Sequence, residues 1–440
     1  MEKISIIGLG KLGLCLAACY AKRGFQVLGI DINKEVVDKV NSGKAPWHEP
    51  GLDEILKEHG GSNLKADTDG RKAIEETDIS IILTATPSNP NGTFSNKYIK
   101  QILNTLSQAL LKNDKPYHLF IISSTVMPGS IEKEFIPLIE SFSGRILNKG
   151  FGVGYDPDFV ALGNVIKGFL EPEMIIIGQS DPEVGYRIER MHAGLCINKP
   201  VISKMSLISA ELAKVCLNAY ITMKISFANV IANLCEKIPN ADPDHVTQAI
   251  GADKRISPYY FKGGLAFGGT CFPRDAQMFH TLMNEYKLFP VLASAIKDIN
   301  FFQDFHLKET VFNEVKKYEV PTVAVLGLSF TANTPVIIES SAIKLISKLL
   351  EENIPVIVYD PHAMPNVRSQ FDNSIIYAES EINCITDANV IIIIHRSDDF
   401  KKAVETMQFK KPVTIIDCWR IINPEQLKGH VHYIPVGKHT

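Results

Sequence analysis

The stretch Ile4-Ser5-Ile6-Ile7-Gly8-Leu9-Gly10-Lys11-Leu12-Gly13 decides the fold of the first part of the chain. Its apolar beginning predicts a β-strand, and the Gly-x-Gly-x-x-Gly motif that follows predicts a tight turn into a helix. Glycines at this spacing let a pyrophosphate approach the backbone and lie at the positive end of the helix. The stretch therefore predicts a Rossmann unit, whose expected dinucleotide contacts are Gly8, Gly10, Lys11, Leu12 and Gly13.

A carboxylate at the end of the next predicted strand strengthens this interpretation. The strand-like run Gln26–Asp31 ends in Asp31, 18 residues after Gly13. A carboxylate at this place accepts hydrogen bonds from ribose hydroxyls and would repel the 2′-phosphate of NADP. We therefore expect the cofactor to be NAD. The alternative is a structural turn in a domain that binds no nucleotide.

Strand-like and helical stretches continue to alternate over the first 200 residues. Apolar runs at Asp78–Leu83, His118–Ser124 and Met174–Gly178 indicate a parallel sheet with helices on both faces. The pattern restarts near Pro321, where Thr322–Gly327 reads as a strand, Ser341–Asn353 as a helix and Pro355–Tyr359 as a strand that leads into Asp360. This second copy lacks the full glycine motif, so only the first copy predicts a dinucleotide site.

A stretch without Gly or Pro, from about Ser203 to Ile238, predicts one long helix between the two copies. The helix is apolar on several faces and should be buried on all sides, partly by a second subunit. We therefore expect an α/β fold in which two Rossmann-like, doubly wound parallel sheets are joined by a helical domain with a long central helix. The expected domains are residues 1–200, 201–300 and 301–440, and the expected assembly is a homodimer.

Composition excludes several classes of function. The 440 residues carry a net charge of −3 with no basic run, which argues against nucleic acid as a partner. No secretory signal is visible, and the longest purely apolar run, Val390–Ile394, is too short to cross a membrane. The eight cysteines form neither a CxxC pair nor a Cys/His cluster, so no disulfide framework and no metal site is expected. We expect a cytoplasmic protein without a membrane partner.

One cysteine lies in a context that favours reactivity. Gly263-Gly264-Leu265-Ala266-Phe267-Gly268-Gly269-Thr270-Cys271-Phe272-Pro273-Arg274-Asp275 combines a glycine-rich approach with Pro273 and Asp275, which are typical of a first helical turn. A thiol at a helix N-terminus beside Arg274 lies in a field that favours the thiolate. Cys271 is therefore a candidate nucleophile. The alternative is an inert buried thiol.

Three polar residues interrupt the apolar surface of the long helix. Glu211, Lys214 and Asn218 share one face, because they are three and four positions apart. Polar groups in an apolar setting need partners or a ligand. The stripe predicts either a catalytic site or an internal ion pair with hydrogen bonds.

Taken together, these segments resemble the UDP-glucose/GDP-mannose dehydrogenases over nearly the whole chain. The resemblance rests on the glycine motif, on the order of the segments along the chain and on the duplicated Rossmann halves. Its other short motifs are Thr86-Pro87, Ser124-Thr125-Val126-Met127-Pro128-Gly129, Asp156-Pro157-Asp158-Phe159-Val160, Lys214-xxx-Asn218 and Gly268-Gly269-Thr270-Cys271-Phe272-Pro273-Arg274-Asp275.

The resemblance implies two successive NAD-dependent oxidations of a nucleotide-hexose at C6, through a thiohemiacetal and a thioester on Cys271. UDP-glucose is the first expected substrate; GDP-mannose and an N-acetylated UDP-hexose are the alternatives. It implies NAD binding by the first domain, dimerisation and catalysis by the second and nucleotide-sugar binding by the third. The residues with implied catalytic roles are Cys271, Lys214, Asn218, Asp275, Asp158 and Thr125. Further cofactor contacts are implied at Thr86, Pro87, Thr125 and Arg274. Substrate contacts are implied at Phe159, Val160, Lys214, Asn218, Arg255, Tyr260, Lys262, Gly268, Phe330 and Arg420.

The sequence departs from the family pattern at several positions. The hydrolytic glutamate is replaced by Asp158, and an acidic residue four positions later by Leu162. A substrate-contacting lysine and an arginine are replaced by Thr331 and Ile338, and the C-terminal arginine is moved by one position to Arg420. We expect Arg420, Lys262 or Arg255 to compensate for the two lost cations.

Two other functions compete with this one. A β-hydroxyacid dehydrogenase also combines a Rossmann domain, a helical domain and a Lys-xxx-Asn pair, but oxidises once and needs no thiol. A nucleotide-sugar binder without activity would be compatible with the losses at Leu162, Thr331 and Ile338. The retention of Cys271 argues against both.

Overall fold

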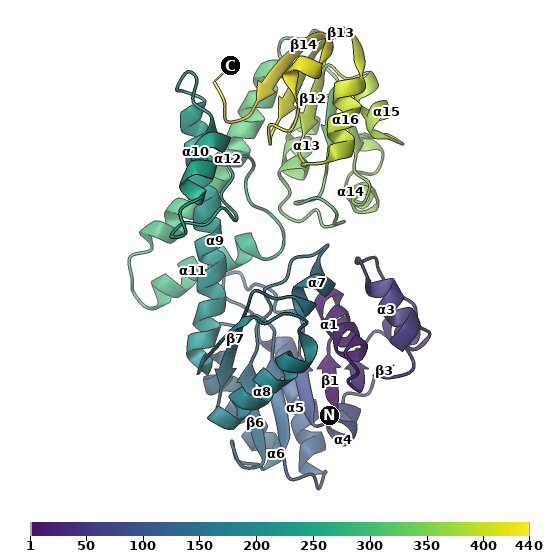
Figure 1. Cartoon of the computed structure of the whole chain (residues 1–440), viewed down its shortest axis with the longest axis vertical. Coiled ribbons are helices and arrows are strands. Elements are labelled where there is room, and N and C mark those ends of the chain that lie inside the picture. Colours follow the sequence, from purple (N-terminus) through teal and green to yellow (C-terminus); the bar gives the residue numbers. More distant parts are fainter. Residues whose placement is uncertain (1, 440) are drawn as a thin grey trace. The chain divides into compact units, whose positions relative to one another are not determined.

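The chain folds into two α/β units, Met1–Cys216 and Leu217–Thr440 (Figure 1). The computed structural model describes residues 2–439. The sheet of the first unit has eight strands in the order β3-β2-β1-β4-β5-β6-β7-β8. These strands are β1 (Ile4–Ile7), β2 (Val27–Ile30), β3 (Leu64–Asp67), β4 (Ile79–Ile82), β5 (His118–Ile122), β6 (Phe151–Tyr155), β7 (Met174–Gln179) and β8 (Val201–Ser206).

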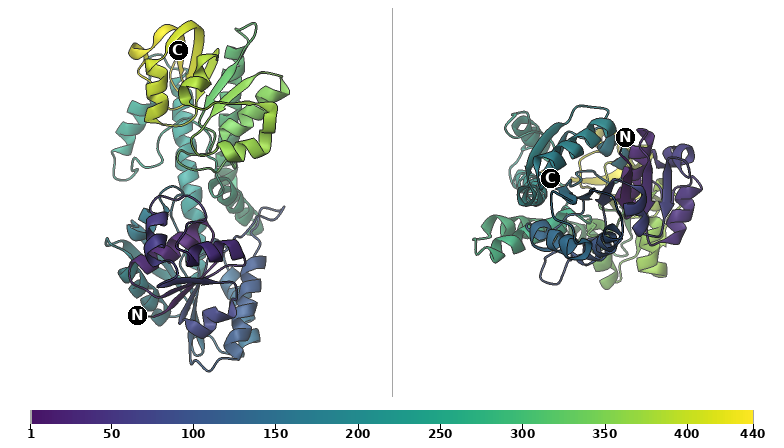
Figure 2. Two further views of the ribbon diagram at one scale, coloured as in Figure 1. Left: turned by 90° about the vertical axis from the view of Figure 1, so that its right-hand side faces the viewer. Right: turned by 90° about the horizontal axis from the view of Figure 1, so that it is seen from below.

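Helices cover both faces of this sheet, as the alternating pattern predicted (Figure 2). The central strands β1, β4 and β5 are buried at every position, because neither face of a strand between two helical layers meets water. The helices of this unit are α1 (Lys11–Lys22), α2 (Lys34–Asn41), α3 (Leu52–His59), α4 (Arg71–Glu76), α5 (Lys97–Leu111), α6 (Ile136–Ser143), α7 (Val165–Leu170) and α8 (Pro182–Leu195), with a π-helical turn at Ile131–Phe135 before α6.

The direction of one strand pair differs from the sequence prediction of a fully parallel sheet. β6 and β7 run antiparallel and pair only at Gly154 with Gln179 and at Tyr155 with Gly178. β8 then runs parallel to β7. An apolar run predicts a buried strand but contains no information on its direction, which depends on the path of the connection through α7.

The long helix α9 (Leu207–Cys235) begins later than predicted. Residues from Val201 to Ser206 form β8 instead, because β7 offers them a continuous ladder of backbone partners. The expectation that α9 is buried on all sides is not met within one chain, since Tyr220, Phe227 and Leu234 are each more than half exposed. By length and composition alone α9 could cross a membrane, but half of its most apolar window is buried inside the fold.

The second unit contains a six-stranded parallel sheet in the order β11-β10-β9-β12-β13-β14. Its strands are β9 (Val323–Leu326), β10 (Val356–Tyr359), β11 (Ile376–Tyr377), β12 (Val390–Ile393), β13 (Gln408–Asp417) and β14 (Lys428–Pro435). The helices that follow α9 are α10 (Pro243–Gly251), α11 (Phe272–Glu285), α12 (Val291–Val315), α13 (Ser341–Glu351), α14 (Met364–Phe371), α15 (Glu381–Thr386) and α16 (Asp398–Thr406), with 3-10 turns at Asp372–Ser374 and Pro424–Gln426. Two Rossmann-like sheets and a long helix between them are therefore present, as predicted.

Both sheets contain the same hydrogen bond from a backbone N–H to an aspartate carboxylate, as the repeated sequence pattern suggested. In the first, the Leu9 N–H donates to the Asp31 carboxylate at 2.7 Å; in the second, the Leu328 N–H donates to Asp360 at 2.8 Å. Asp360 is buried and also accepts hydrogen bonds from Ser329, His362 and Ala363. Both carboxylates are thus held by backbone N–H groups, but Asp360 is buried whereas Asp31 is partly exposed.

Candidate active site

The glycine loop between β1 and α1 has the geometry that a bound pyrophosphate requires. Gly8 has a φ of +98°, and a Cβ there would lie 2.4 Å from the carbonyl oxygen of Leu83. A Cβ at Gly13 would lie 1.9 Å from the carbonyl oxygen of Gly8, so the helix packs closely on the turn. A Cβ at Gly10, by contrast, would meet nothing within 4 Å. The first and third glycines therefore shape the turn, and the second leaves the N-terminus of α1 accessible to a ligand.

The remaining predicted cofactor residues surround this loop in the first unit. Asp31 Oδ1 accepts the N–H of Asn33 at 2.8 Å, which holds the carboxylate at the end of β2. Thr86 Oγ1 donates to the carbonyl oxygen of Thr125 at 2.8 Å, which joins the loops after β4 and β5. The residues present fit NAD, since a carboxylate and an open helix N-terminus lie together at the carboxyl ends of β1 and β2.

Lys214, near the beginning of α9, belongs to a group formed by the loop after β6. Its ammonium group donates to the backbone carbonyl of Asp158 and lies 4.5 Å from the centre of the Phe159 ring. Val160, the residue after Phe159, packs on an apolar core of the first unit. The structure therefore brings together four residues that the sequence analysis assigned to catalysis or substrate binding.

The carboxyl group of Asp158 is electrostatically unusual. Burial raises its pKa to about 8, and the neighbouring Asp156 carboxylate adds to the effect, against the opposing charges of Lys214 and His192. A carboxyl group with a pKa near 8 exchanges protons close to neutral pH, as a general base must.

An ion pair that the sequence pattern did not predict lies beside this group. His192 Nε2 on α8 contacts Asp156 Oδ2 at 2.9 Å, and both side chains are largely buried. Burial lowers the pKa of His192, but the interactions with Asp156 outweigh it and raise the pKa to about 10. The signal in the sequence was the pair of aspartates in Asp156-Pro157-Asp158, because a buried carboxylate needs a cationic partner.

Glu211, which lies on the same face of α9 as Lys214, has backbone partners in the turn after β5. Its carboxylate accepts the backbone N–H groups of Gly129 and Ile131 at 2.5 and 3.0 Å. The polar stripe is thus partly structural, because Glu211 anchors the turn that contains Pro128 and Gly129.

Asn218, one helical turn after Lys214, belongs to a group in the second unit. Asn218 Nδ2 donates to Asp275 Oδ2 at 2.6 Å, and Arg274 Nε donates to Asp275 Oδ1 at 3.1 Å. The Asp275 carboxylate is almost completely buried, so both of its oxygens depend on these partners. Three predicted site residues are therefore fixed relative to one another.

Cys271 lies at the N-cap of α11, one helical turn from Asp275. The helix begins at Phe272, in agreement with the prediction of a first turn around Pro273. Cys271 is the exposed member of the eight cysteines, whereas six are buried and Cys216 is intermediate. Its Sγ lies 3.6 Å from the Thr270 hydroxyl. The thiol is accessible and stands at the positive end of a 14-residue helix.

Two glycines before Cys271 allow a close packing that the sequence pattern did not predict. A Cβ at Gly268 would lie 2.3 Å from the carbonyl oxygen of Glu339, and one at Gly269 would lie 2.6 Å from the Phe330 ring. Gly269 N–H also donates to the Ile338 carbonyl at 3.0 Å. The glycines therefore allow the Cys271 loop to pack on the segment 330–339 of the same unit.

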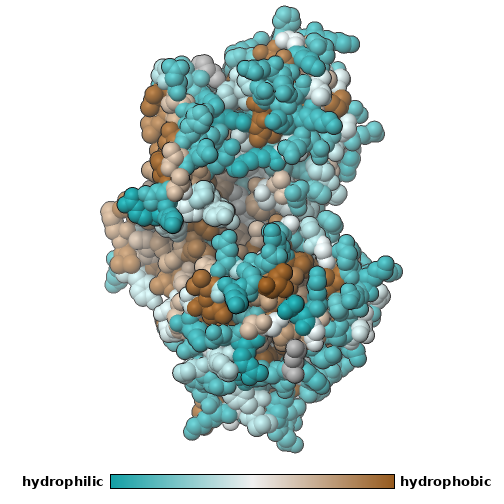
Figure 3. Space-filling model, in the orientation of Figure 1, coloured by the Kyte–Doolittle hydropathy of each residue, from teal (hydrophilic) through white to brown (hydrophobic). Residues whose placement is uncertain are grey.

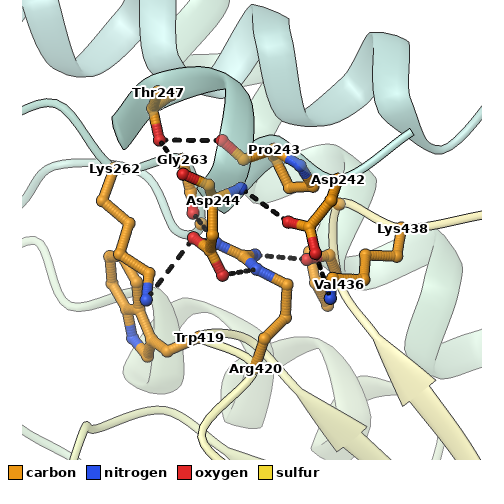
Figure 4. A network of polar contacts seen from close by, with 12 residues as sticks. Asp242, Pro243, Asp244, Thr247, Lys262, Gly263, Trp419, Arg420, Val436 and Lys438 are labelled. Carbon is orange, nitrogen blue, oxygen red and sulfur yellow. Dashed lines mark hydrogen bonds and ion pairs between the residues drawn. The ribbon is translucent and has the colours of Figure 1, made fainter. Parts of the chain in front are cut away.

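Lys262 and Arg420 meet at Asp244 on α10 (Figure 4). Arg420 forms a bidentate pair with this carboxylate at 2.9 Å and donates to the carbonyls of Gly263 and Val436, and its side chain is almost fully buried. Lys262 lies 3.5 Å from the same carboxylate. Arg420 thus has protein partners for its donors, which the sequence did not reveal.

Arg255 and Tyr260 are placed apart from this network. Arg255 is strongly exposed and pairs with Asp253 at 2.6 Å. Tyr260 is exposed and has a φ of +57°, and its ring lies edge-on to Phe272. Within residues 2–439, neither side chain forms a hydrogen bond or an ion pair with Cys271. Their role in binding therefore stays a prediction.

Comparison with known proteins identifies the family over nearly the whole chain. Residues 2–196 match the NAD-binding domain, residues 208–301 the central domain and residues 324–424 the UDP-binding domain of the UDP-glucose/GDP-mannose dehydrogenase family.

Individual relatives agree with this result. The chain is 32% identical to the UDP-glucose 6-dehydrogenase AglM of Haloferax volcanii, over 96% of this chain and 97% of the relative. It is 30% identical to the GDP-mannose 6-dehydrogenase of Pseudomonas syringae, over 94% and 96% of the two chains.

The fold agrees as well. A UDP-glucose dehydrogenase structure from Pyrobaculum islandicum superimposes with a TM-score of 0.90 at 26% identity, covering 100% of this chain and 98% of that one. The resemblance seen in the sequence is therefore confirmed, and the chain belongs to the UDP-glucose/GDP-mannose dehydrogenase family, whose members are NAD-dependent nucleotide-sugar 6-dehydrogenases.

Proposed function

We propose that this protein oxidises UDP-glucose to UDP-glucuronate in two steps, through a thioester on Cys271. The observation that carries the proposal is the exposed Cys271 thiol at the N-terminus of α11, one turn from the buried Asp275–Asn218 pair. A single oxidation would not need a nucleophile, whereas capture of an aldehyde does. The relatives named above include both UDP-glucose and GDP-mannose 6-dehydrogenases, so the nucleotide and the sugar are the finer part of the proposal.

The roles proposed for the residues follow from their chemistry. NAD, when bound, supplies the hydride acceptor for both oxidations. Lys214 and Asn218 stabilise negative charge on the reacting oxygen. Cys271 Sγ forms a bond to the aldehyde carbon, which gives a thiohemiacetal and, after its oxidation, a thioester. Water then attacks the thioester carbon, its proton passes to Asp158, and the carbon–sulfur bond breaks to release the carboxylate and the thiol; Asp275 and Thr125 orient the water.

The substrate and the four-electron stoichiometry are tested together. UDP-glucose, UDP-N-acetylglucosamine, UDP-N-acetylmannosamine and GDP-mannose are supplied in limiting amount, and NADH is measured per sugar consumed. We expect UDP-glucose to give the highest kcat/KM and two NADH per molecule. One NADH per molecule would contradict the thioester route, and a higher kcat/KM for another nucleotide sugar would replace UDP-glucose as the substrate.

The proposal predicts that product release depends on pH through Asp158. A base must be deprotonated to act, and the pKa of Asp158 is raised to about 8. The rate of thioester hydrolysis should therefore rise with pH up to about 8 and level off above it. The Asp156→Asn variant removes a negative charge that raises the pKa of Asp158 more than the charge of His192 lowers it. The variant should therefore lower the pKa of Asp158, and the hydrolysis rate should rise at lower pH.

Single-turnover hydrolysis measured from pH 6 to pH 9 checks this result. His192→Gln provides the opposite control, because it removes a positive charge and leaves Asp156 without its partner. The midpoint should then move to higher pH. If Asp156→Asn leaves the midpoint where it is, Asp158 is not the group that limits hydrolysis.

We further propose a homodimer in the cytoplasm, formed through α9 and α12. Several aromatic side chains on these helices are strongly exposed, among them Phe227 and Phe301, which is 76% exposed. Figure 3 shows apolar atoms over the part of the surface where Figure 1 places α11 and α12. Exposed apolar surface of this extent is typical of an interface.

We also propose that the chain has three functional domains: a cofactor domain (1–200), a dimerisation and catalytic domain (201–300) and a nucleotide-sugar domain (301–440).

Light scattering should give twice the 48.8 kDa of one chain. Phe301→Glu should shift the mass towards that of a monomer, because it places a charge in an apolar contact. Phe142→Glu, at an exposed position of α6, should not. An unaltered protein that is fully active as a monomer would refute the dimer.

A further inference from the structure

Three basic residues and the Asp244 carboxylate interact electrostatically near the end of β12 in the second unit. Arg396 follows β12 by three residues, and Lys262 and Arg420 lie beside the Asp244 carboxylate. Arg420 and Asp244 neutralise each other through their bidentate pair. Burial lowers the pKa of Lys262, and repulsion from Arg396 and Arg420 adds to this against the attraction of Asp244. The cations are therefore close enough to repel one another.

Arg396 differs from its neighbours because it has no acidic partner. Within residues 2–439 it forms no hydrogen bond and no ion pair within 4 Å, and it is exposed. Its guanidinium carbon lies 4.3 Å from the centre of the Trp419 ring. The indole is itself fixed, since Trp419 Nε1 donates to the Ile394 carbonyl at 2.7 Å. Stacking of this kind orients the guanidinium while leaving its donors in the plane available.

The position of Arg396 in the sheet is the one at which ligands bind in open α/β folds. The chain runs from β9 outward to β10 and β11 and returns to β12 on the other side, so the strand order reverses between β9 and β12. Ligands bind outside the carboxyl ends of the strands at such a switch point. His395, which precedes Arg396, donates from Nε2 to the Ser329 carbonyl after β9 at 2.9 Å, so both strand ends are held together here.

We propose that Arg396 binds the diphosphate of the nucleotide-sugar substrate, with Trp419 as the platform that orients it. The proposal rests on the proposed function and names a residue of its nucleotide site. A planar guanidinium forms two parallel hydrogen bonds to phosphate oxygens, and a dianionic group would also relieve the repulsion between Arg396 and Lys262. Arg396, rather than Arg420, then provides the cation that compensates for Thr331 and Ile338, because the donors of Arg420 already have partners in the protein.

Trp419 offers a direct reporter for the test. The chain contains two tryptophans, Trp47 and Trp419, so the full-length Trp47→Phe protein has its tryptophan fluorescence from Trp419 alone. In this background, UDP and uridine are titrated separately. We expect Arg396→Ala to weaken UDP binding roughly 10- to 100-fold, as for the loss of charge-assisted hydrogen bonds, and to leave uridine binding unchanged. Arg396→Lys, which keeps the charge but not the planar donors, should fall between the two.

Arg368→Ala is the matched control, because Arg368 is also exposed and stacked on an aromatic ring, 4.1 Å from the centre of Tyr377 in the same unit. It should bind UDP as tightly as the Trp47→Phe protein. Equal UDP affinity with and without Arg396 overturns the proposal, and so does an equal loss of UDP and uridine, which indicates a structural role. If the protein binds GDP instead of UDP, the proposed substrate is wrong, and the same comparison with GDP and guanosine still decides the role of Arg396.

Discussion

Replacement of Cys271 by serine is expected to abolish the second oxidation while a single oxidation remains measurable. The thiol is accessible at the N-terminus of α11, and a serine hydroxyl at the same place is a far weaker nucleophile towards an aldehyde. Loss of a covalent nucleophile costs up to about 10⁶-fold in rate, so we expect the formation of two NADH per sugar to slow by roughly 10³-fold or more. NADH yield and product identity under limiting UDP-glucose measure the effect.

Cys216→Ser is the matched control for this variant. Cys216 is the cysteine with the next highest exposure, and it lies inside α9 and not at a helix N-terminus. It should retain two NADH per sugar at close to the original rate. If Cys271→Ser also forms two NADH per sugar at the original rate, this protein does not use a thioester, and a reaction without covalent capture must be considered.

The second large effect is expected for Asp158→Asn, which should allow both oxidations and stall the release of product. Asp158 lies in the group held by Lys214, and its raised pKa suits a residue that accepts a proton from water. Loss of a general base costs typically ~10²–10⁴-fold. The covalent intermediate should therefore accumulate on Cys271, and mass spectrometry of the intact protein, mixed with UDP-glucose and NAD, should detect it.

Two further variants make this result specific. Asp158→Glu restores the longer acid of the family and should release product without accumulation of the adduct. The double variant Asp158→Asn with Cys271→Ser should show no adduct, because the attacking thiol is absent. Rapid turnover by Asp158→Asn without any adduct would mean that another residue, or water alone, completes the hydrolysis.

Much of the architecture could be predicted from the sequence because it depends on local patterns. The apolar runs at β1, β4 and β5 indicated buried strands, and the glycine motif indicated the turn from β1 into α1 with its accessible helix N-terminus. The start of α11 near Pro273 was predictable for the same reason, since capping and proline preferences act within one helical turn. Asp31 could be found because one helix, a turn and one strand separate it from the motif by a nearly fixed length.

What the sequence could not determine is which distant side chains meet. Asn218 and Asp275 are 57 positions apart, His192 and Asp156 are 36 apart, and Arg420 and Asp244 are 176 apart. Each of these contacts depends on how whole elements pack, and no local periodicity reports it. The antiparallel pairing of β6 with β7 belongs to the same class, because strand direction follows the path of the connection.

The sequence and the tertiary structure differ most in what they show about the charged residues. From the sequence, Arg420 was a candidate for binding the substrate, and Arg396 attracted no attention. The amino-acid sequence by itself determined the buried strands, the glycine turns and the place of Cys271 at a helix start. Only the tertiary structure decided that Arg420 is neutralised by Asp244 and that Arg396 is not, because the electrostatic environment of a charge is set by the neighbours that folding brings within a few ångströms of it.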